Sequence, residues 1–358
     1  MISGTIKSKC LLIFTVTITV FTANTSFAQS NEVLAKSTYL QAEENFQSKN
    51  FKKTIKNLDN TIKYLGESNG RIEALYVKTY KALNDFIEAE KHLALYFEMA
   101  DESRNDYMEM VKLSSSIKEK AESRKKEKEA IEVELQKFMS PDYFVKIEGG
   151  NFILELQQID FSGNIGRYRK SVKSFSMGKT EVTYGLYLAY CYDVGKKRPY
   201  RSSTRPKYTY NDAIAVNYLE AKRFCQWASK KLGKNISIPT VEQWQFAAKG
   251  GNKSKGFKYS GSNNLDEVAW YYDNMVNSGY YGAVAQKKPN ELGLYDMSGN
   301  LAEWTSSIHP NNGFPDSNFV IVQGCSYISG KYSSIKKCFG GKMKDDYDGK
   351  TGFRMVIN

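Results

Sequence analysis

Histidine is scarce in this 358-residue chain, which contains only His92 and His309. Zinc and iron sites built on imidazole need more ligands than this, so a histidine-based metal centre is excluded. Cysteine is also scarce, and none of the five cysteines forms a Cys-x-x-Cys pair. We therefore expect the two histidines to have structural or surface roles.

The sequence near the N-terminus also lacks an apolar run that is long enough to span a membrane easily. The run Cys10–Thr22 is short, follows Lys7 and Lys9, and precedes Ser26-Phe27-Ala28, which is a small-x-small cleavage pattern. We predict a signal peptide over residues 1–28 and a periplasmic or secreted mature protein without a stable membrane span. The alternative is a membrane anchor that stays attached. Cys10 opens the apolar run instead of ending it, so we do not expect it to carry a lipid.

The charge is basic, with 51 Lys and Arg against 39 Asp and Glu, a formal net charge of +12. Such a charge favours anionic partners. Acidic residues interleave with the basic ones in the densest charged stretch, residues 118–129, and cancel most of the field that nucleic-acid binding needs. We therefore expect no nucleic-acid partner. With 41% hydrophobic residues, the chain can bury a sizeable core and is long enough for two domains.

Proline is absent from residues 31–136, where apolar residues recur at helical spacing. Phe86 follows Phe51 by 35 residues, and Leu93 follows Leu58 by the same interval. A repeat of this length predicts stacked helical hairpins. The expected helices are Glu32–Ser48, Phe51–Leu65, Arg71–Leu83 and Asp85–Met99, with a turn at Ser48-Lys49-Asn50.

This all-α region, residues 29–140, resembles tetratricopeptide repeats over about two repeats. Ala42 and Phe46 fall where small and large packing residues alternate, although the usual tryptophan, glycine and closing proline are missing. An unclassified bundle of helical hairpins is the alternative. Both predict a surface that binds other envelope proteins more than a reaction centre.

A charged helix is expected over Ser103–Leu135, because opposite charges recur at i, i+4 spacing in residues 118–129. The stretch has no apolar stripe, so we predict a semi-rigid spacer that packs on little. Beyond Pro141 the composition changes to glycine, tyrosine and tryptophan with many turns.

Local patterns after Pro141 predict mixed secondary structure. Phe144–Ile147 and Gly149–Phe152 suggest two strands around a tight turn, and Tyr218–Leu232 is an amphipathic helix. Cys225 shares the apolar face of that helix with Ala221, Phe224 and Ala228, so we expect a packed thiol and not a nucleophile.

Five motifs follow in order, and together they resemble the formylglycine-generating enzymes of the sulfatase-modifying factor family. They are KTEVTYGLYLAY (179–190), SIPTVEQWQFAAKGG (237–251), PNELGLYDMSGNLAEW (289–304), GCSY (324–327) and GFR (352–354). The resemblance implies a compact α+β domain, related to C-type lectins, over residues 141–358.

A calcium site is expected in the segment DMSGNLAEW. Asp296 and Glu303 are hard oxygen donors, and clustered carboxylates without a counter-charge are costly. The family resemblance implies a structural calcium ion held by Asp296, Glu303 and the carbonyls of Gly299 and Leu301. The alternative is a turn without an ion, in which Asn300 bonds to the backbone. A second family site would lie near Asp273 and Asn274, where the match is loose.

The family's redox centre is missing from this sequence. The resemblance implies a copper(I) ion between two cysteines five residues apart after a Gly-Gly-Ser turn, and aligning GCSY with that turn places Ser329 and Ser334 at those positions. Copper(I) requires soft thiolates, which a serine hydroxyl cannot replace. We therefore expect neither copper nor the family's oxidase chemistry.

The cysteines of the mature chain are Cys191, Cys225, Cys325 and Cys338. In an oxidising compartment one or two disulfides are allowed, and the sequence does not choose among the three pairings. A disulfide or two buried thiols is expected for Cys325 and Cys338, and a relocated copper pair is the alternative.

Two classes of function remain. The first is an exported, non-catalytic binding or assembly module, similar to the catalytically silent relatives found in the gliding and secretion machineries of Bacteroidetes envelopes. A peptide or glycan could then contact Tyr271, Tyr272, Tyr280 and Tyr281, unless these tyrosines are core or loop packing. The second is an oxidase that forms formylglycine on exported sulfatases.

Overall fold

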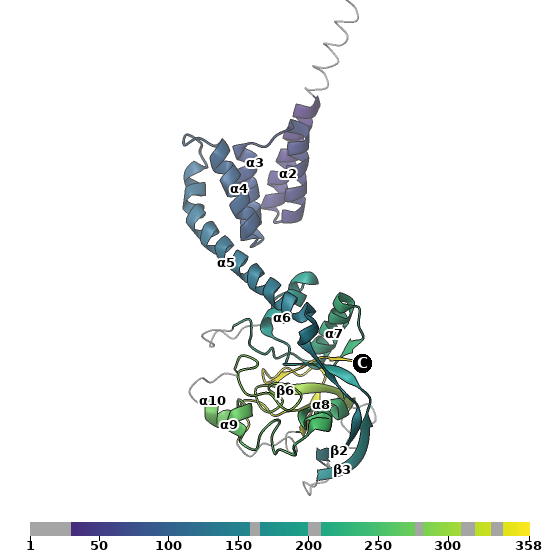
Figure 1. Ribbon diagram of the computed structural model, residues 1–358. Helices are drawn as coiled ribbons and strands as arrows, with labels where there is room; N and C mark the ends of the chain where they lie inside the picture. The colour runs from purple at the N-terminus through teal and green to yellow at the C-terminus, as the bar shows by residue number, and fades with distance from the viewer. Residues whose placement is uncertain (1–29, 158–164, 200–208, 276–281, 309–318, 331–338) are drawn as a thin grey trace, which may run out of the picture. The chain divides into compact units, whose positions relative to one another are not determined.

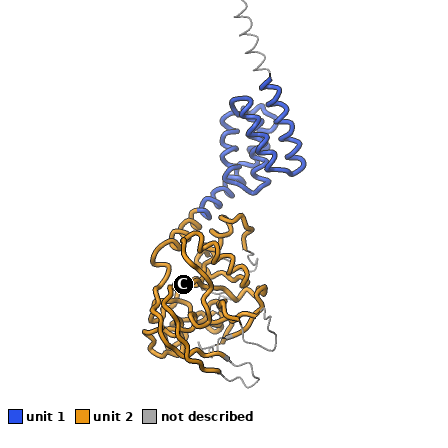
Figure 2. Tube along the Cα trace, turned by 90° about the vertical axis from the view of Figure 1, so that its right-hand side faces the viewer, with its two compact units in different colours: residues 1–128 blue, residues 129–358 orange. Residues whose placement is uncertain are grey.

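The computed structural model describes residues 30–157, 165–199, 209–275, 282–308, 319–330 and 339–358 (Figure 1). The predicted signal peptide lies outside these ranges. The chain divides into two compact units, Met1–Lys128 and Glu129–Asn358 (Figure 2). No helix in the described ranges is both long enough and apolar enough to cross a lipid bilayer.

The first unit is built from helical hairpins, as predicted. Residues 30–47 are helical, and α2 (Phe51–Leu65), α3 (Gly70–Ala82), α4 (Phe86–Met99) and the first part of α5 (Tyr107–Met139) follow. Lys49 and Asn84 adopt positive φ angles of 58° and 60° at the tight turns. Asn69 caps α3 by accepting hydrogen bonds from Arg71 N and Ile72 N.

The 35-residue interval has a physical basis in burial. Three buried positions of α2 recur 35 residues later as buried positions of α4, so both helices turn equivalent faces to the core. These pairs are Thr54 and Ala89, Leu58 and Leu93, and Thr61 and Tyr96. Ala42 is also fully buried, in a cluster with Leu58, Ile72 and Tyr76.

The prediction that the charged helix is a spacer that packs on little was wrong. Helix α5 exists, but it is not a rod that packs on little: its first part buries Met110, Ile117 and Ala121 in the core of the first unit. Its last part buries Ile131 and Phe138 in the core of the second unit. Met110, Leu113, Ile117 and Ala121 recur three to four residues apart, as on one helical face, and Leu113 packs against the same core. The dense charges of residues 118–129 follow this apolar face and favoured the interpretation as a solvated spacer.

The unit boundary lies between Lys128 and Glu129, whereas the sequence suggested 140 and 141. The end of α5 belongs with the second unit because Phe138 is fully buried there, stacked on Trp227 with ring centroids 5.9 Å apart. Glu134 also accepts a hydrogen bond from Thr183 Oγ1 at 2.7 Å.

The second unit has mixed helices and short strands, which confirms the predicted α+β class. Its sheets have the strand orders β1-β4-β10-β5, β2-β3 and β8-β7-β6-β9, and the described pairs are antiparallel except β6 with β9. The strands are β1 (Phe144–Ile147), β2 (Gly150–Gln157), β3 (Ile165–Val172), β4 (Phe175–Gly178), β5 (Ile236–Ser237), β6 (Ala302–Ile308), β7 (Phe319–Gln323), β8 (Phe339–Met343), β9 (Thr351–Gly352) and β10 (Val356–Ile357).

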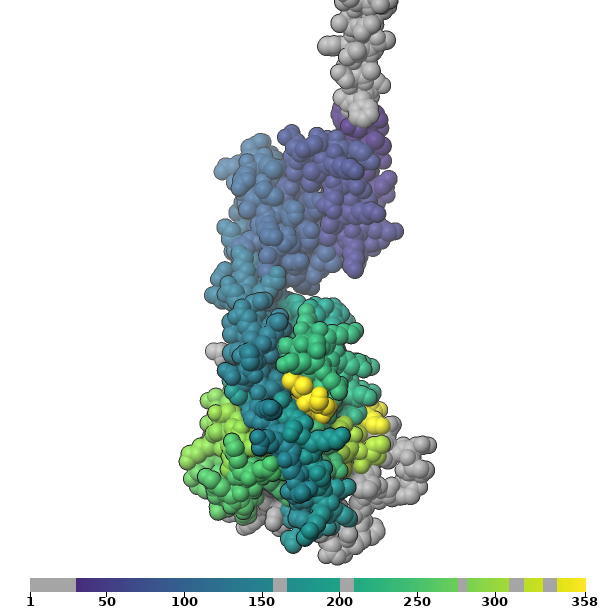
Figure 3. Space-filling model, turned by 45° about the vertical axis from the view of Figure 1, so that its right-hand side comes forward, coloured from purple at the N-terminus to yellow at the C-terminus, as the bar shows by residue number. Residues whose placement is uncertain are grey.

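The helices of this unit are α6 (Tyr184–Asp193), α7 (Tyr218–Leu232), α8 (Val241–Ala248), α9 (Leu265–Val268) and α10 (Tyr272–Met275). Helix α7 has the predicted bounds, and Ala221, Phe224, Cys225 and Ala228 are buried. Strands β1 and β2 exist, but they do not pair with each other, because β1 pairs with β4 and β2 with β3. The C-terminal strand β10 lies between β4 and β5, where its yellow atoms are visible between teal and green segments (Figure 3).

Replacing Phe138 tests whether the end of α5 is part of the second core. We expect Phe138→Ala to lower the free energy of unfolding by about 3–5 kcal/mol, because the side chain is fully buried against Trp227 and Tyr143. The neighbouring Met139 is 56% exposed, so Met139→Ala should change stability by less than about 0.5 kcal/mol. Urea denaturation measures both, and equal effects would show that α5 does not pack there.

Candidate functional site

The loop before β6 has a tightly constrained backbone. Asp296, Gly299 and Asn300 all have positive φ angles, of 58°, 78° and 53°. A Cβ on Gly299 would lie 2.1 Å from the carbonyl oxygen of Trp270, so only glycine fits. Asn300 N donates to that same Trp270 oxygen at 2.8 Å. The loop is therefore held in one conformation that turns Asp296 inward, where it is 2% exposed.

Glu303, at the start of β6, is paired with Arg354, and both side chains are fully buried. Arg354 Nε and Nη2 lie 2.7 Å from Glu303 Oε2 and Oε1, which is a bidentate ion pair. Trp244 Nε1 also donates to Glu303 Oε2, at 2.8 Å. Both oxygens of the Glu303 carboxylate are thus engaged by protein donors.

Arg354 also ties distant segments together through carbonyl oxygens. Its Nη1 donates to Gly178 and Lys179 at 3.2 and 3.3 Å, and its Nη2 donates to Tyr295 at 2.9 Å. The guanidinium therefore links the end of β4, the loop that precedes Asp296, and β6. Such a buried arginine needs this many acceptors, since each unpaired donor would be costly in the core.

Two further carboxyl groups lie beside this ion pair, and each has one oxygen without a hydrogen-bond partner among the described residues. Glu181 is fully buried and accepts from Asn300 Nδ2 at 3.0 Å through one oxygen. Asp296 accepts from Ala285 N at 2.7 Å through Oδ2. In the described part of the chain, Glu181 Oε2, Asp296 Oδ1 and Asn300 Oδ1 are buried without a hydrogen-bond partner.

The cluster contains one arginine, Arg354, and three acidic residues, so its carboxyl groups outnumber its positive charges. Burial, and then the charges of Asp296 and Glu303, raise the pKa of Glu181 well above its usual range. Burial is also the main reason that the pKa of Asp296 rises to about 6, with Glu303 adding to it. The site therefore holds an excess of carboxylate that a proton or a cation would relieve.

The structure brings the predicted ligands Asp296 and Glu303 into one cluster and changes their roles. The sequence argument for calcium assumed no counter-charge, but Arg354 supplies one and engages Glu303 directly. Sequence reasoning also missed Glu181 and Arg354, although the motifs KTEVT and GFR contain them. The ion pair between Glu303 and Arg354 joins residues that are 51 positions apart in the sequence, which no local pattern reveals.

A calcium ion is compatible with the donors that remain. Among described residues, no three His, Cys, Asp or Glu side chains are grouped as a metal site, so an ion would depend on carbonyl and amide oxygens as well as on carboxylates. The orphaned oxygens of Asp296, Glu181 and Asn300 are all hard donors, which suit calcium and not copper. Gly299 and Leu301 lie in the same loop, and Leu301 N donates to Glu181 Oε1 at 3.4 Å.

Ser329 lies in a turn after β7 and has a local structural partner. Its Oγ accepts a hydrogen bond from Ser326 N at 3.1 Å, and its backbone N donates to Ser326 O at 2.8 Å. Ser329 O accepts from Tyr272 N at 3.1 Å. Ser334 lies outside the described residues.

The described cysteines fall into two groups. Cys191 and Cys225 are free and buried, and burial raises the pKa of their thiols to about 11 and about 12. Cys325 is disulfide-bonded, and Cys338 lies outside the described residues. A thiol with so high a pKa is a poor nucleophile and a poor metal ligand at neutral pH.

The four tyrosines proposed as a binding surface do not share one environment, and the second calcium position, Asp273 and Asn274, directly follows Tyr272 in the sequence. Tyr271 is buried and donates to Asp266 Oδ1 at 2.8 Å, so it is a core residue, whereas Tyr272 is 57% exposed. Tyr280 and Tyr281 lie outside the described residues. Asn274 Oδ1 accepts from Tyr271 N at 2.9 Å, and Asp273 is exposed.

Comparison with known proteins defines the class. The model for the sulfatase-modifying factor enzyme 1-like domain matches residues 128–358. The chain therefore belongs to this family of formylglycine-generating enzyme-like proteins, which confirms the resemblance drawn from the motifs.

The curated relatives carry the names of a chaperone, an inactive enzyme and an enzyme. A protein named chaperone protein LppX from Paenibacillus barcinonensis is 41% identical over 107 residues, covering 26% of this chain and 38% of the relative. Inactive C-alpha-formylglycine-generating enzyme 2 from Bos taurus is 29% identical over 123 residues, covering 32% and 38%. Formylglycine-generating enzyme from Bos taurus is 29% identical over 141 residues, covering 33% and 35%. The chain thus spans less than two fifths of each of these relatives.

A solved structure has the same fold as the second unit. Treponema denticola variable protein 1 matches with a TM-score of 0.50 at 23% identity, covering 60% of this chain and 94% of that one.

Removing Arg354 tests how far the fold depends on it. We expect Arg354→Met to lower the free energy of unfolding by about 3–5 kcal/mol, because Glu303 would remain buried and unpaired. Lys288 forms an exposed ion pair with Glu267 at 3.1 Å, so Lys288→Met should cost less than about 1 kcal/mol. Denaturant melts of both variants measure the difference, and similar losses would contradict the assignment.

The pH dependence of stability tests the excess carboxylate. Because Asp296 binds its proton more tightly when folded, its contribution is fully present below about pH 4 and is lost as the pH rises to about 6. In chelator, we expect stability to fall over this window, and Asp296→Asn to remove that fall. Added calcium should restore stability at pH 7 only in the chain that retains Asp296. Identical pH profiles for the two chains would contradict the shift.

Proposed function

We propose that this chain is an exported, non-catalytic protein-binding or assembly module of the bacterial cell envelope, built on a sulfatase-modifying-factor domain. The observation that carries the proposal is Ser329, which occupies the position aligned with the first copper-binding cysteine of the family. Its hydroxyl accepts the N–H of Ser326 and completes a turn. A hard hydroxyl used in this way cannot hold copper(I).

The remaining thiols support the same conclusion. Cys191 and Cys225 are buried in the core with raised thiol pKa values, and Cys325 is disulfide-bonded. None of these described cysteines is a reactive thiolate of the kind the family's oxidation needs. The names of two relatives, an inactive enzyme and a chaperone, agree with a scaffold that has lost its chemistry, although each covers about a third of this chain or less.

Other envelope proteins are the proposed partners, through the helical unit, and a peptide or glycan is proposed on the second unit. The signal peptide predicted from residues 1–28 supports export. A link to gliding or secretion machinery is part of the proposal, and it rests only on the family resemblance drawn from the sequence. The tetratricopeptide-like character of residues 29–140 is part of this proposal and is supported by equivalent buried positions 35 residues apart.

Calcium is proposed as a structural cofactor of the second unit. It would be held by Asp296, Glu181 and Asn300 together with carbonyls of the Gly299–Leu301 segment, and would neutralise the excess carboxylate beside Arg354. The relation of this unit to C-type lectins, implied by the family resemblance, is proposed with it.

The competing function is a formylglycine-generating oxidase, favoured by the 29% identity to the enzyme from Bos taurus. It requires a copper-binding thiol pair, for which Cys325 and Cys338 would be the candidates. The disulfide at Cys325 weighs against it, since a disulfide sulfur does not ligate copper(I).

Copper(I) titration separates the two functions. We expect the reduced mature chain to show neither tight one-to-one copper(I) binding against a chelator nor oxygen-dependent loss of cysteine from a sulfatase-motif peptide, measured by mass spectrometry. The double variant Ser329→Cys, Ser334→Cys is the matched control, and restoring both thiols should restore copper binding. Tight binding with turnover by the unmodified chain would establish the oxidase instead.

A further inference from the structure

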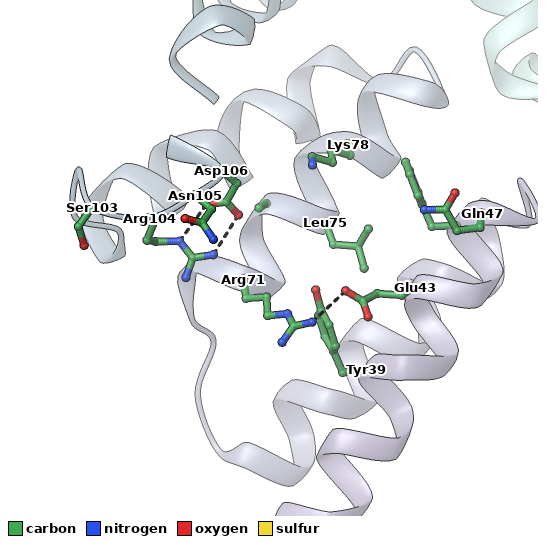
Figure 4. A pocket seen from close by; sticks show the side chains of 12 residues that line it. Tyr39, Glu43, Gln47, Arg71, Leu75, Lys78, Ser103, Arg104, Asn105 and Asp106 are labelled. Atoms are coloured by element: carbon green, nitrogen blue, oxygen red, sulfur yellow. Dashed lines mark hydrogen bonds and ion pairs between the residues drawn. The ribbon is translucent and has the colours of Figure 1, made fainter. Parts of the chain in front are cut away.

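The exposed charges of the two units are balanced differently. In the helical unit, a cavity of about 650 Å³ is lined by three cationic side chains (Figure 4). Each of them has an acidic partner: Arg71 binds Glu43, Arg104 binds Asp106 and Lys78 binds Glu109. The cavity therefore has no excess charge with which to select an anionic ligand.

The exposed face of α7 in the second unit is strongly basic. Lys222, Arg223, Gln226 and Lys230 are exposed and recur three to four residues apart, so they share one face of the helix. Glu220 is the only acidic residue in α7. Lys222 and Lys230 form no ion pair with any residue that the structure describes, so their charges are not neutralised.

The segment that follows α6 adds three consecutive cations, Lys-Lys-Arg at residues 196–198. Two ion pairs hold this segment beside α7. Lys196 binds the carboxylate of Glu220, and Lys231 Nζ donates to Asp193 Oδ1 at 2.9 Å. The exposed cations of residues 196–198 therefore lie next to those of α7 and form one surface with them.

Positive charge remains on this surface after its ion pairs are counted. Helix α7 and residues 192–198 contain seven Lys and Arg side chains but only two acidic ones, Asp193 and Glu220. The neighbouring loop 344–346 contacts the start of α7 through backbone carbonyls and carries one lysine and two aspartates. An excess of four positive charges remains even when this loop is included.

Apolar side chains are exposed among these cations. Tyr192 and Val194 are 48% and 49% exposed, and Leu219, the neighbour of Glu220, is 39% exposed. The guanidinium of Arg198 lies over the Tyr192 ring, 5.8 Å from its centroid, and donates to the Tyr192 hydroxyl at 2.8 Å. Exposed apolar side chains between cations are typical of protein surfaces that lie on anionic lipid bilayers.

We propose that α7 and residues 192–198 bind the surface of an anionic lipid bilayer. The cations would contact the headgroup phosphates, while Tyr192, Val194 and Leu219 would enter the interfacial layer. A soluble polyanion would leave these apolar side chains in water. Lysine is a point charge on a flexible stem, so lysines spread over an open helix face suit a diffuse layer of phosphates better than a fixed ion pair with a protein. The inference goes beyond the proposed function, because it gives the second unit a lipid partner.

The test uses the full mature chain and co-sedimentation with vesicles of phosphatidylcholine, either alone or mixed with anionic phosphatidylglycerol. We expect binding to the mixed vesicles to be at least about tenfold tighter and to weaken as salt is added. The double variant Lys222→Gln, Lys230→Gln should weaken this binding about 25-fold, since each cation near an anionic bilayer contributes about fivefold. The matched control is Lys52→Gln, Lys53→Gln, which removes the same charge from exposed positions of α2 and should have no effect.

A second variant tests the apolar contribution. Val194→Ser should weaken binding to the mixed vesicles about threefold, because it loses methyl groups that would leave water on binding. The same variant should bind soluble polyphosphate as the unmodified chain does, because it retains every cation of the surface.

Several results would overturn the proposal. Equal binding to the two kinds of vesicle, no binding to either by the folded chain, or equal effects of the two double variants would exclude an anionic lipid surface. Polyphosphate that binds as tightly as the vesicles, with Val194→Ser unchanged on both, would show a site for soluble polyanions. Competition by inorganic phosphate at constant ionic strength would show a discrete phosphate site. None of these results alters the copper(I) titration, so each would leave the proposed non-catalytic function standing.

Discussion

The ion pair between Arg354 and Glu303 is the interaction on which the second unit depends. It lies where several short strands and loops meet, and Arg354 spans them through Glu303 and three backbone carbonyls. A domain with strands as short as two residues has few ladder hydrogen bonds to hold it. A buried, multiply bonded arginine takes over part of that task, because its geometry specifies which segments are neighbours.

The same interaction is consistent with the proposal that the scaffold is kept without a copper centre. The residues that organise the interior, namely Glu181, Asp296, Glu303 and Arg354, include none of the positions aligned with the copper thiols. Ser329 lies in a different turn, where it needs only a hydroxyl to accept the N–H of Ser326. A serine at this position therefore keeps the local turn, and the proposed binding role on the same fold is physically consistent.

The helical unit is stabilised in a different way from the second unit. Its stability comes from local hairpins whose equivalent faces repeat at 35 residues, so each helix mainly contacts its neighbours in the chain. Stacking of this kind leaves one side of the helices lined with side chains that the core does not require. Arg71 is such a residue: its exposed guanidinium lies over the ring of Tyr39, and both residues line a cavity in this unit.

The sequence by itself determined the helical hairpins, the bounds of α7 and the family of the second unit, because periodicity and ordered motifs are local signals. It also predicted that Asp296 and Glu303 share a site. Only the tertiary structure decided that Arg354 neutralises Glu303 and that Glu181 joins the cluster, since these contacts join residues 51 and about 120 positions apart. It also decided that the two ends of α5 are buried: apolar residues such as Met110 and Ile117 lie on one helical face, but whether that face is covered depends on partners that fold around it.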